Sequence, residues 1–239
     1  MLYVCPHFDR MPPRMSQHAR LYAFPARPEP GDFVLLDSGA YGLSQRGRQI
    51  GPAHMRRLAE YYRPYAGQTG YCCIAPDVYL DPARTRHNWL WWQEHIGLPV
   101  APVIQFPAAG RIDVYAGLKQ AEFYAAWQPD VMSISNPALR ATASTANELL
   151  AAEVRHITGC RWLHNLGAGW SPADIADWRD LACFDSIDSV AYYTDAQRGV
   201  RWRLDGRTER SAAPWRQIAV ENAGVAAQIA GSTAFGGRY

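Results

Sequence analysis

Short apolar runs that end in polar or small residues recur along the chain. Residues 35–41 read Leu-Leu-Asp-Ser-Gly-Ala-Tyr, so a buried-strand pattern runs directly into a carboxylate. Four further runs end in the same way, at residues 74–77, 103–105, 162–167 and 187–189. The carboxyl ends of parallel strands are where α/β enzymes place their chemistry. The pattern therefore predicts one pocket built from several strand ends.

The apolar runs predict strands, and most are separated by segments with helical periodicity. The expected strands are 1–5, 33–37, 71–75, 100–105, 131–135, 161–166 and 184–192. The expected helices are 52–62, 82–96, 114–127, 145–159, a short one from 172, and 214–230. Residues 10–31 are rich in Pro and Arg and are expected to form a long exposed loop.

Alternation of strands and helices from end to end favours an α/β fold with parallel βα units. The expected architecture is a (β/α)₈ barrel of the TIM type over residues 1–239, as a single domain that allows one irregular position. A doubly wound parallel sheet is the alternative. Two helix starts are marked by a capping residue followed by proline, at Asp81-Pro82 and Ser171-Pro172.

Composition excludes some classes of function. The chain has 239 residues, of which 48% are hydrophobic, and a net charge of +2, so its total charge creates no strong field for nucleic acid. Lys119 is the only lysine, a bias that a GC-rich genome explains best. Arginine is also the better side chain for bidentate phosphate contacts. The candidates for such contacts are Arg10, Arg14, Arg20, Arg27, Arg46, Arg48, Arg56 and Arg57, although such a run is as often a solvated face.

The five cysteines are not spaced like a metal site or a disulfide scaffold. No Cys-x-x-Cys and no His-x-x-x-His pair occurs, so we expect buried reduced thiols and no bound metal. No apolar stretch approaches the length of a membrane span, and we expect a cytoplasmic protein without a membrane partner. Nothing in the sequence calls for a redox cofactor or a nucleotide-triphosphate loop, so no cofactor is expected.

Five motifs, in identity and in order, resemble those of the tRNA-guanine transglycosylase superfamily. The segment 37–41, Asp-Ser-Gly-Ala-Tyr, is similar to that family's Asp-Ser-Gly-Gly-Phe/Tyr motif. Asp77, Gln105 and the Leu-Gly-Ala-Gly turn at 166–169 resemble its later base-binding motifs. The segment 184–192, Phe-Asp-Ser-Ile-Asp-Ser-Val-Ala-Tyr, resembles its nucleophile segment. The resemblance covers about residues 33–195.

The chain departs from the family pattern in several places. The cysteine-rich zinc motif of the tRNA enzymes is absent, Ala40 replaces the second glycine, and residues 133–136 read Ser-Ile-Ser-Asn where a Gly-Gly loop is expected. The chain is also much shorter than the tRNA enzymes. It looks more like the compact relatives that place 7-deazaguanines in DNA.

The resemblance implies a (β/α)₈ enzyme that exchanges guanine in nucleic acid, DNA favoured over tRNA, for a queuosine-related 7-deazaguanine of the preQ0 type. It implies Asp188 as the nucleophile and Asp37 as the acid and base. Asp185 is the alternative nucleophile, because it matches the Phe-Asp pattern equally well. Asp185 and Asp188 lie an odd number of residues apart, so on a strand only one of them faces the pocket.

The resemblance also implies a guanine pocket. Asp77 would accept hydrogen bonds from N1–H and the 2-amino group, while Gln105 and the backbone N–H of Gly167 would address O6. Tyr41 would stack on the ring, and Ser38 and Gly39 complete the expected substrate-binding set. Without the resemblance, a core amide, a tight turn and core packing explain Gln105, Gly167 and Tyr41 better.

Two other functions remain open from the sequence. An N-glycosidase would use the same pocket with water as the acceptor of the sugar. A non-catalytic or partner-dependent nucleic-acid-binding subunit would keep the fold without the chemistry, but it has no chemical need for both Asp37 and Asp188. Whether a protein partner supplies further nucleic-acid surface is likewise open.

Overall fold

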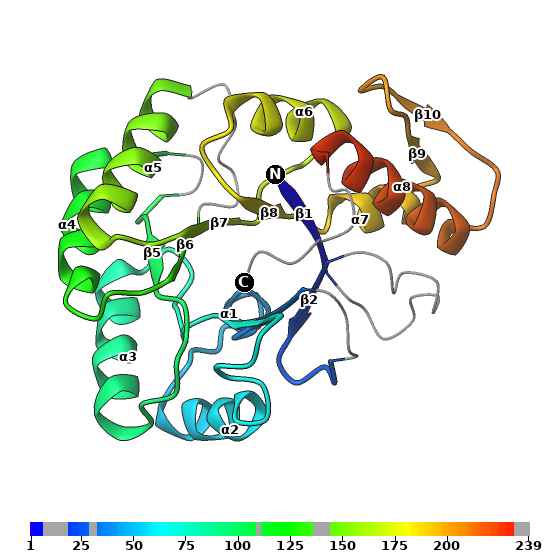
Figure 1. The fold of residues 1–239 in the computed structure, drawn as a ribbon. Coiled ribbons are helices and arrows are strands. Elements are labelled where there is room, and N and C mark those ends of the chain that lie inside the picture. Colours follow the sequence, from blue (N-terminus) through cyan, green and yellow to red (C-terminus); the bar gives the residue numbers. More distant parts are fainter. Residues whose placement is uncertain (7–18, 29–32, 109–110, 136–143, 232–239) are drawn as a thin grey trace.

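The protein has a mixed α/β fold in which eight strands form one parallel sheet. The computed structural model describes residues 1–6, 19–28, 33–108, 111–135 and 144–231 (Figure 1). The parallel strands are β1 (Leu2–Pro6), β2 (Arg20–Ala23), β3 (Val34–Asp37), β4 (Tyr71–Cys73), β5 (Val103–Gln105), β6 (Val131–Ser135), β7 (Trp162–Leu166) and β8 (Ser186–Asp188). A separate antiparallel pair is formed by β9 (Val200–Trp202) and β10 (Thr208–Arg210).

The eight parallel strands follow the order β4-β3-β2-β1-β8-β7-β6-β5. The two end strands of this order are not far apart, because a parallel bridge joins Ile74 just after β4 to Ala101 just before β5. Two backbone hydrogen bonds accompany the bridge: Ala75 N–H donates to Ala101 O at 2.9 Å, and Ala101 N–H donates to Cys73 O at 2.7 Å.

Helices connect most of the strands; α3, α4 and α5 lie on one side of the sheet and α8 on another, whereas the short α1 lies near the centre of the view (Figure 1). Their bounds are α1 (Ala40–Ser44), α2 (Pro52–Tyr62), α3 (Pro82–His95), α4 (Val114–Ala125), α5 (Ser144–Thr158), α6 (Pro172–Leu181), α7 (Ala191–Gln197) and α8 (Trp215–Ala230). The expected caps of α3 and α6 are present: Asp81 accepts from Arg84 N–H and Ser171 from Asp174 N–H. None of the described helices is long and apolar enough to cross a membrane.

Side chains of alternate residues pack on opposite faces of the sheet, as period-2 geometry requires. On β3, Val34 and Leu36 pack in one apolar cluster with Leu58 and Tyr62 of α2. Leu35 instead belongs to the larger cluster, which contains residues from β1, β5, β6, β7 and β8. Strands buried on both faces explain why the apolar runs of the sequence are nearly continuous.

Two sequence-based predictions of local structure are wrong, and further elements were not predicted. The expected loop 10–31 contains β2, whose residues Arg20 and Tyr22 are buried and hydrogen-bonded to each other at 2.8 Å; the rest of that loop lies partly outside the described residues. The expected strand 184–192 covers only Ser186–Asp188, and α7 begins at Ala191, whose N–H donates to Ser189 Oγ. The sequence analysis also missed α1 and the β9–β10 hairpin.

Close contact between α4 and α5 predicts opposite effects of two Gly→Ala substitutions in helices. A Cβ at Gly117 would lie 2.6 Å from the buried Leu150 Cδ1, whereas at Gly224 in α8 nothing lies within 4 Å. We expect Gly117→Ala to lower the free energy of unfolding by about 1 kcal/mol. Gly224→Ala, the matched control, should raise it by about 0.5–1 kcal/mol because alanine favours helix. Urea unfolding measures both, and equal effects would contradict this packing.

Candidate functional site

Three aspartates from different strands meet at one cavity at the carboxyl ends of the sheet. Asp37 ends β3, Asp188 ends β8, and Asp77 lies in the loop after β4. The cavity has a volume of about 520 Å³ and is lined by all three, together with Gly39, Tyr41 and Gly167. The expectation of a single pocket built from strand ends is therefore matched by the positions of these residues.

Asp37 is held by the turn that follows β3. Gly39 N–H donates to Asp37 Oδ2 at 3.1 Å. Gly39 has a φ of 75°, and a Cβ there would lie 3.0 Å from the backbone oxygen of Phe24. Two features therefore require glycine at this position: the left-handed backbone conformation and the close approach of the Phe24 backbone.

Asp77 is clamped by two side chains from neighbouring elements. Ser38 Oγ donates to Asp77 Oδ1 at 2.8 Å, and Gln105 Nε2 donates to Asp77 Oδ2 at 2.6 Å. Asp77 is only 5% exposed, so these bonds replace the water that its carboxylate has lost. Both donors are fully buried and lie behind Asp77 rather than among the residues that line the cavity.

The side-chain oxygen of Gln105 makes a second hydrogen bond. Its Oε1 accepts a hydrogen bond from Leu80 N–H at 3.3 Å. Leu80 has a φ of 56°, a conformation that is costly for a residue with a branched side chain. Gln105 therefore fixes both Asp77 and the loop that follows it, whereas the sequence analysis placed its amide on the O6 edge of a base.

Asp188 receives two hydrogen bonds on the same oxygen. Gly167 N–H and His164 Nε2 each lie 3.0 Å from Asp188 Oδ1. Gly167 lines the cavity as expected, but its N–H points to Asp188 in this structure rather than into free space. His164 is fully buried, and no ligand spacing in the sequence links it to Asp188.

The environment of the cavity raises the pKa of two of these carboxyl groups, Asp37 and Asp77. Burial raises the pKa of Asp37 to about 7, and the neighbouring charges of Asp77 and Asp188 act in the same direction. Burial also raises the pKa of Asp77, but the hydrogen bonds from Ser38 and Gln105 oppose that change. A carboxyl group that is partly protonated near neutral pH is suited to give and take a proton.

Aromatic and cationic side chains lie at the mouth of the cavity. Tyr41 is 55% exposed and meets the ring of Tyr79 edge-on, with centroids 5.2 Å apart. Trp170 and Arg46 also line the cavity. The sequence analysis missed Tyr79 and Trp170, although they follow the motif residues Asp77 and Gly167 by two and three positions.

Asp185 lies away from the cavity, at the start of β8. Its Oδ2 pairs with Arg155 Nη2 at 2.8 Å and accepts from Leu163 N–H at 2.6 Å. The structure therefore brings Asp188, and not Asp185, together with Asp37 and Asp77. Of the arginines named above, Arg46 lines the cavity, Arg20 is buried, and Arg10 and Arg14 lie outside the described residues; Arg27, Arg48, Arg56 and Arg57 are exposed.

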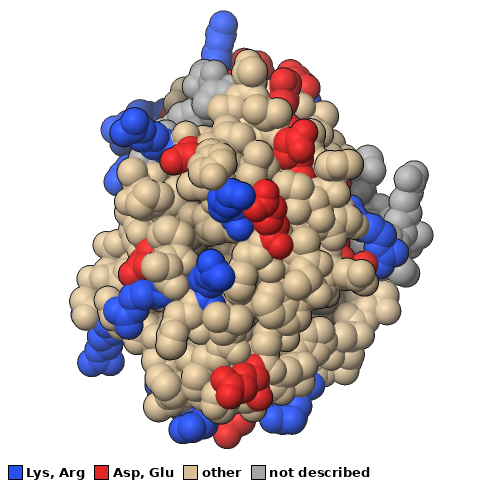
Figure 2. Space-filling model, turned by 90° about the vertical axis from the view of Figure 1, so that its left-hand side faces the viewer, with Lys and Arg blue, Asp and Glu red and all other residues tan. Residues whose placement is uncertain are grey.

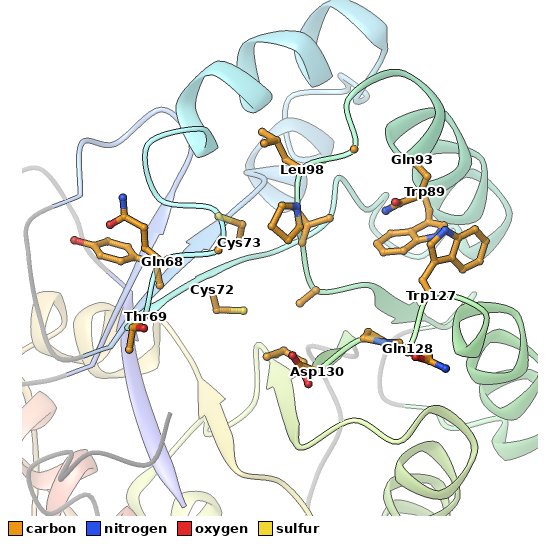
Figure 3. A pocket seen from close by; sticks show the side chains of 18 residues that line it. Gln68, Thr69, Cys72, Cys73, Trp89, Gln93, Leu98, Trp127, Gln128 and Asp130 are labelled. Atoms are coloured by element: carbon orange, nitrogen blue, oxygen red, sulfur yellow. The ribbon is translucent and has the colours of Figure 1, made fainter.

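A second cavity, of about 480 Å³, lies at the opposite ends of β4 and β6. Figure 3 shows Gln68, Thr69 and Cys72 on one side of it and Trp89, Gln93 and Trp127 on the other. The only carboxylate among its described lining residues is Asp130, which is paired with Arg161 at 3.0 Å. This cavity therefore lacks the paired acidic groups that distinguish the first.

The described cysteines are not joined in disulfides. Cys72, Cys73 and Cys160 are buried, Cys183 is half-buried, and burial raises the pKa of Cys72 to about 12, so its thiol is protonated. Within the described part of the chain, no three His, Cys, Asp or Glu side chains are grouped so that they could hold a metal ion.

The raised pKa of Asp37 predicts a cost in stability. Its folded-state pKa of about 7 exceeds the ordinary 3.8, so the folded protein binds the proton more tightly and the carboxylate opposes folding as pH rises from about 4 to 7. Asp37→Asn should therefore raise the free energy of unfolding at pH 8 by about 1–2 kcal/mol and have little effect at pH 4. Urea unfolding at both pH values tests this, with the exposed Asp180→Asn as control. An equal effect at the two pH values would contradict it.

The sequence matches no protein-family model, and no curated protein matches it significantly.

Proposed function

We propose that this chain is a base-exchange glycosyltransferase that replaces guanine in nucleic acid with a 7-deazaguanine derivative such as a preQ0-type base. The observation that carries the proposal is the meeting of Asp37 and Asp188, from strands distant in sequence, at one cavity that also holds Asp77. DNA is favoured over tRNA as the substrate, because the sequence lacks the zinc motif of the tRNA enzymes.

We also infer that the parallel sheet is closed into a (β/α)₈ barrel. The support is the eight-strand parallel order together with the bridge between Ile74 and Ala101, which joins its two ends. In such a barrel the strand-end cavity lies at the carboxyl-terminal face, where TIM-barrel enzymes carry their active sites.

The chemistry proceeds in two displacements. Asp188 attacks the anomeric carbon, forming a C1′–O bond while the C1′–N9 bond breaks and its electron pair passes to the leaving guanine. The guanine takes a proton from Asp37, which becomes a carboxylate. In the second half, Asp37 removes a proton from the incoming base, whose nitrogen attacks C1′ and releases Asp188.

Base recognition is assigned to Asp77, which would accept from N1–H and the 2-amino group of guanine through lone pairs that Ser38 and Gln105 leave open. An acceptor held in place by two donors discriminates well, because a base without matching N–H groups leaves it unpaired. Tyr41, exposed at the mouth, provides an aromatic surface on which a base can stack.

A base inside a duplex must leave the stack to reach the cavity. Arg46 at its mouth is placed to meet a phosphate of the displaced nucleotide. Figure 2 shows the side of the molecule that carries α3, α4 and α5, where acidic and basic side chains are interspersed and no single-sign field forms. The proposed nucleic-acid surface is therefore the rim of the cavity rather than that side.

Trapping the covalent intermediate tests the proposal. Wild-type protein mixed with guanine-containing DNA, and separately with tRNA, is examined by intact mass spectrometry. We expect an adduct with DNA that is lost in Asp188→Asn and retained in Asp185→Asn, its matched control three residues earlier. Circular dichroism confirms that both variants are folded.

The other possible results of this experiment each contradict one part of the proposal or favour another function. Loss of the adduct only in Asp185→Asn would contradict the assignment of the nucleophile. An adduct with tRNA alone would contradict the preference for DNA. Release of guanine by water without incorporation of an added base would favour the N-glycosidase, and binding without any reaction would favour the non-catalytic subunit.

Proton donation by Asp37 predicts a pH dependence of the first displacement. Because the pKa of Asp37 is about 7, the single-turnover rate should fall with increasing pH above that value. Asp37→Asn should lower the rate by about 100- to 10,000-fold. With N7-methylguanine, which leaves without being protonated, the same substitution should cost much less. An equal loss with both substrates would contradict the role of Asp37 as acid.

A further inference from the structure

A line of hydrogen-bonded polar side chains runs up through the buried core to Asp188. Trp162 Nε1–H donates to Ser186 Oγ at 2.8 Å, Ser186 Oγ lies 2.7 Å from His164 Nδ1, and His164 Nε2 lies 3.0 Å from Asp188 Oδ1. His164 pairs in register with Ser186 on the adjacent strand, so these side chains share one face of the sheet. Ser186 and His164 are both fully buried.

Burying such a line of polar side chains costs free energy of folding, because the surrounding core is mostly apolar. Buried polar groups cost free energy unless each finds a partner, and a fully connected set is conformationally rigid. Ser133 on β6 is a buried polar residue outside this line. It pairs in register with His164 of β7, and its Oγ has no hydrogen-bond partner among the described residues.

The donors and acceptors determine the protonation of His164. The indole N–H of Trp162 can only donate, so it occupies a lone pair of Ser186 Oγ. The hydroxyl hydrogen of Ser186 then has one described acceptor, His164 Nδ1, and it can donate there only if Nδ1 carries no proton. The proton of a neutral imidazole is therefore on Nε2, where it donates to the carboxylate of Asp188.

We propose that His164, in the neutral Nε2–H tautomer set by Ser186 and Trp162, is the positioning residue that leaves Asp188 Oδ2 as the reacting atom. This inference rests on the proposed function for its kinetic consequence but not for the tautomer. Asp188 Oδ1 is occupied by the His164 and Gly167 donors, whereas Oδ2 accepts no hydrogen bond from the described residues. The two bonds fix the plane of the carboxylate at the cavity wall and direct the free lone pairs of Oδ2 at the sugar.

The tautomer is tested on the wild-type protein without any reaction. In ¹⁵N-histidine-labelled protein, the His164 ring should show a protonated Nε2 and an unprotonated Nδ1, and Ser186→Ala should shift the Nδ1 resonance. A protonated Nδ1 in the wild type would overturn the proposal, whatever the protein's activity.

The positioning role is tested by the rate of adduct formation at saturating DNA. His164→Leu removes the donor and should slow the reaction by about 10- to 100-fold, the loss expected for one hydrogen bond to a charged group, while the Kd for DNA stays unchanged. His164→Gln places an amide N–H near the Nε2 position and should recover most of the rate. Ser133→Ala, on the neighbouring strand, should react like the wild type.

The outcomes separate this inference from the proposed function. An active wild type whose rate is unchanged in His164→Leu, or not recovered in His164→Gln although both variants are folded, would overturn the positioning role and leave the transglycosylase intact. A wild type that forms no adduct would remove the proposed function, while the NMR measurement would still decide the tautomer.

Discussion

Removal of three carboxyl groups from bulk water into one cavity is the constraint to which the surrounding residues are fitted. Each carboxylate needs donors to remain charged away from bulk water, and each of the three has them. Asp77 accepts from Ser38 and Gln105, and Asp188 from His164 and Gly167. Asp37 accepts from the backbone N–H groups of Gly39 and Ser38. Burial, together with the charges of Asp77 and Asp188, raises the pKa of Asp37 to about 7.

The loops that follow the strands hold these donors in place through unusual backbone conformations. Gly39, Leu80 and Gly167 have φ values of 75°, 56° and 76°, and each takes part in a hydrogen bond that orients, directly or through Gln105, one of the three aspartates. For Leu80 this conformation costs free energy that the rest of the fold must supply. The site is consequently preorganised before any ligand is bound.

The sequence predicts elements whose signals are local and misses those that depend on distant partners. Helix α2 and strand β6 occupy the expected residues, because periodicity and flanking turn residues define them. Strand β2 was missed because it forms by pairing with β1 and β3, and because a buried arginine, Arg20, is not typical of a strand. The strand-end rule located Asp37, Asp77 and Asp188, but the contacts of Gln105 with Leu80 and of Gly167 with Asp188 join segments 25 and 21 residues apart. No spacing rule contains that information.

The join between β4 and β5 has a consequence for how the molecule fluctuates. It consists of one bridge with its two hydrogen bonds, whereas the neighbouring pair β5–β6 is in register over three residue pairs. Asp77 and Gln105 stand on opposite sides of this seam, and their 2.6 Å hydrogen bond ties it together. Asp77 keeps its hydrogen bond to Gln105 only while this contact is closed. Local separation of β4 from β5 and binding of a molecule at Asp77 therefore exclude each other. A molecule bound at Asp77 would therefore also stabilise the contact between β4 and β5.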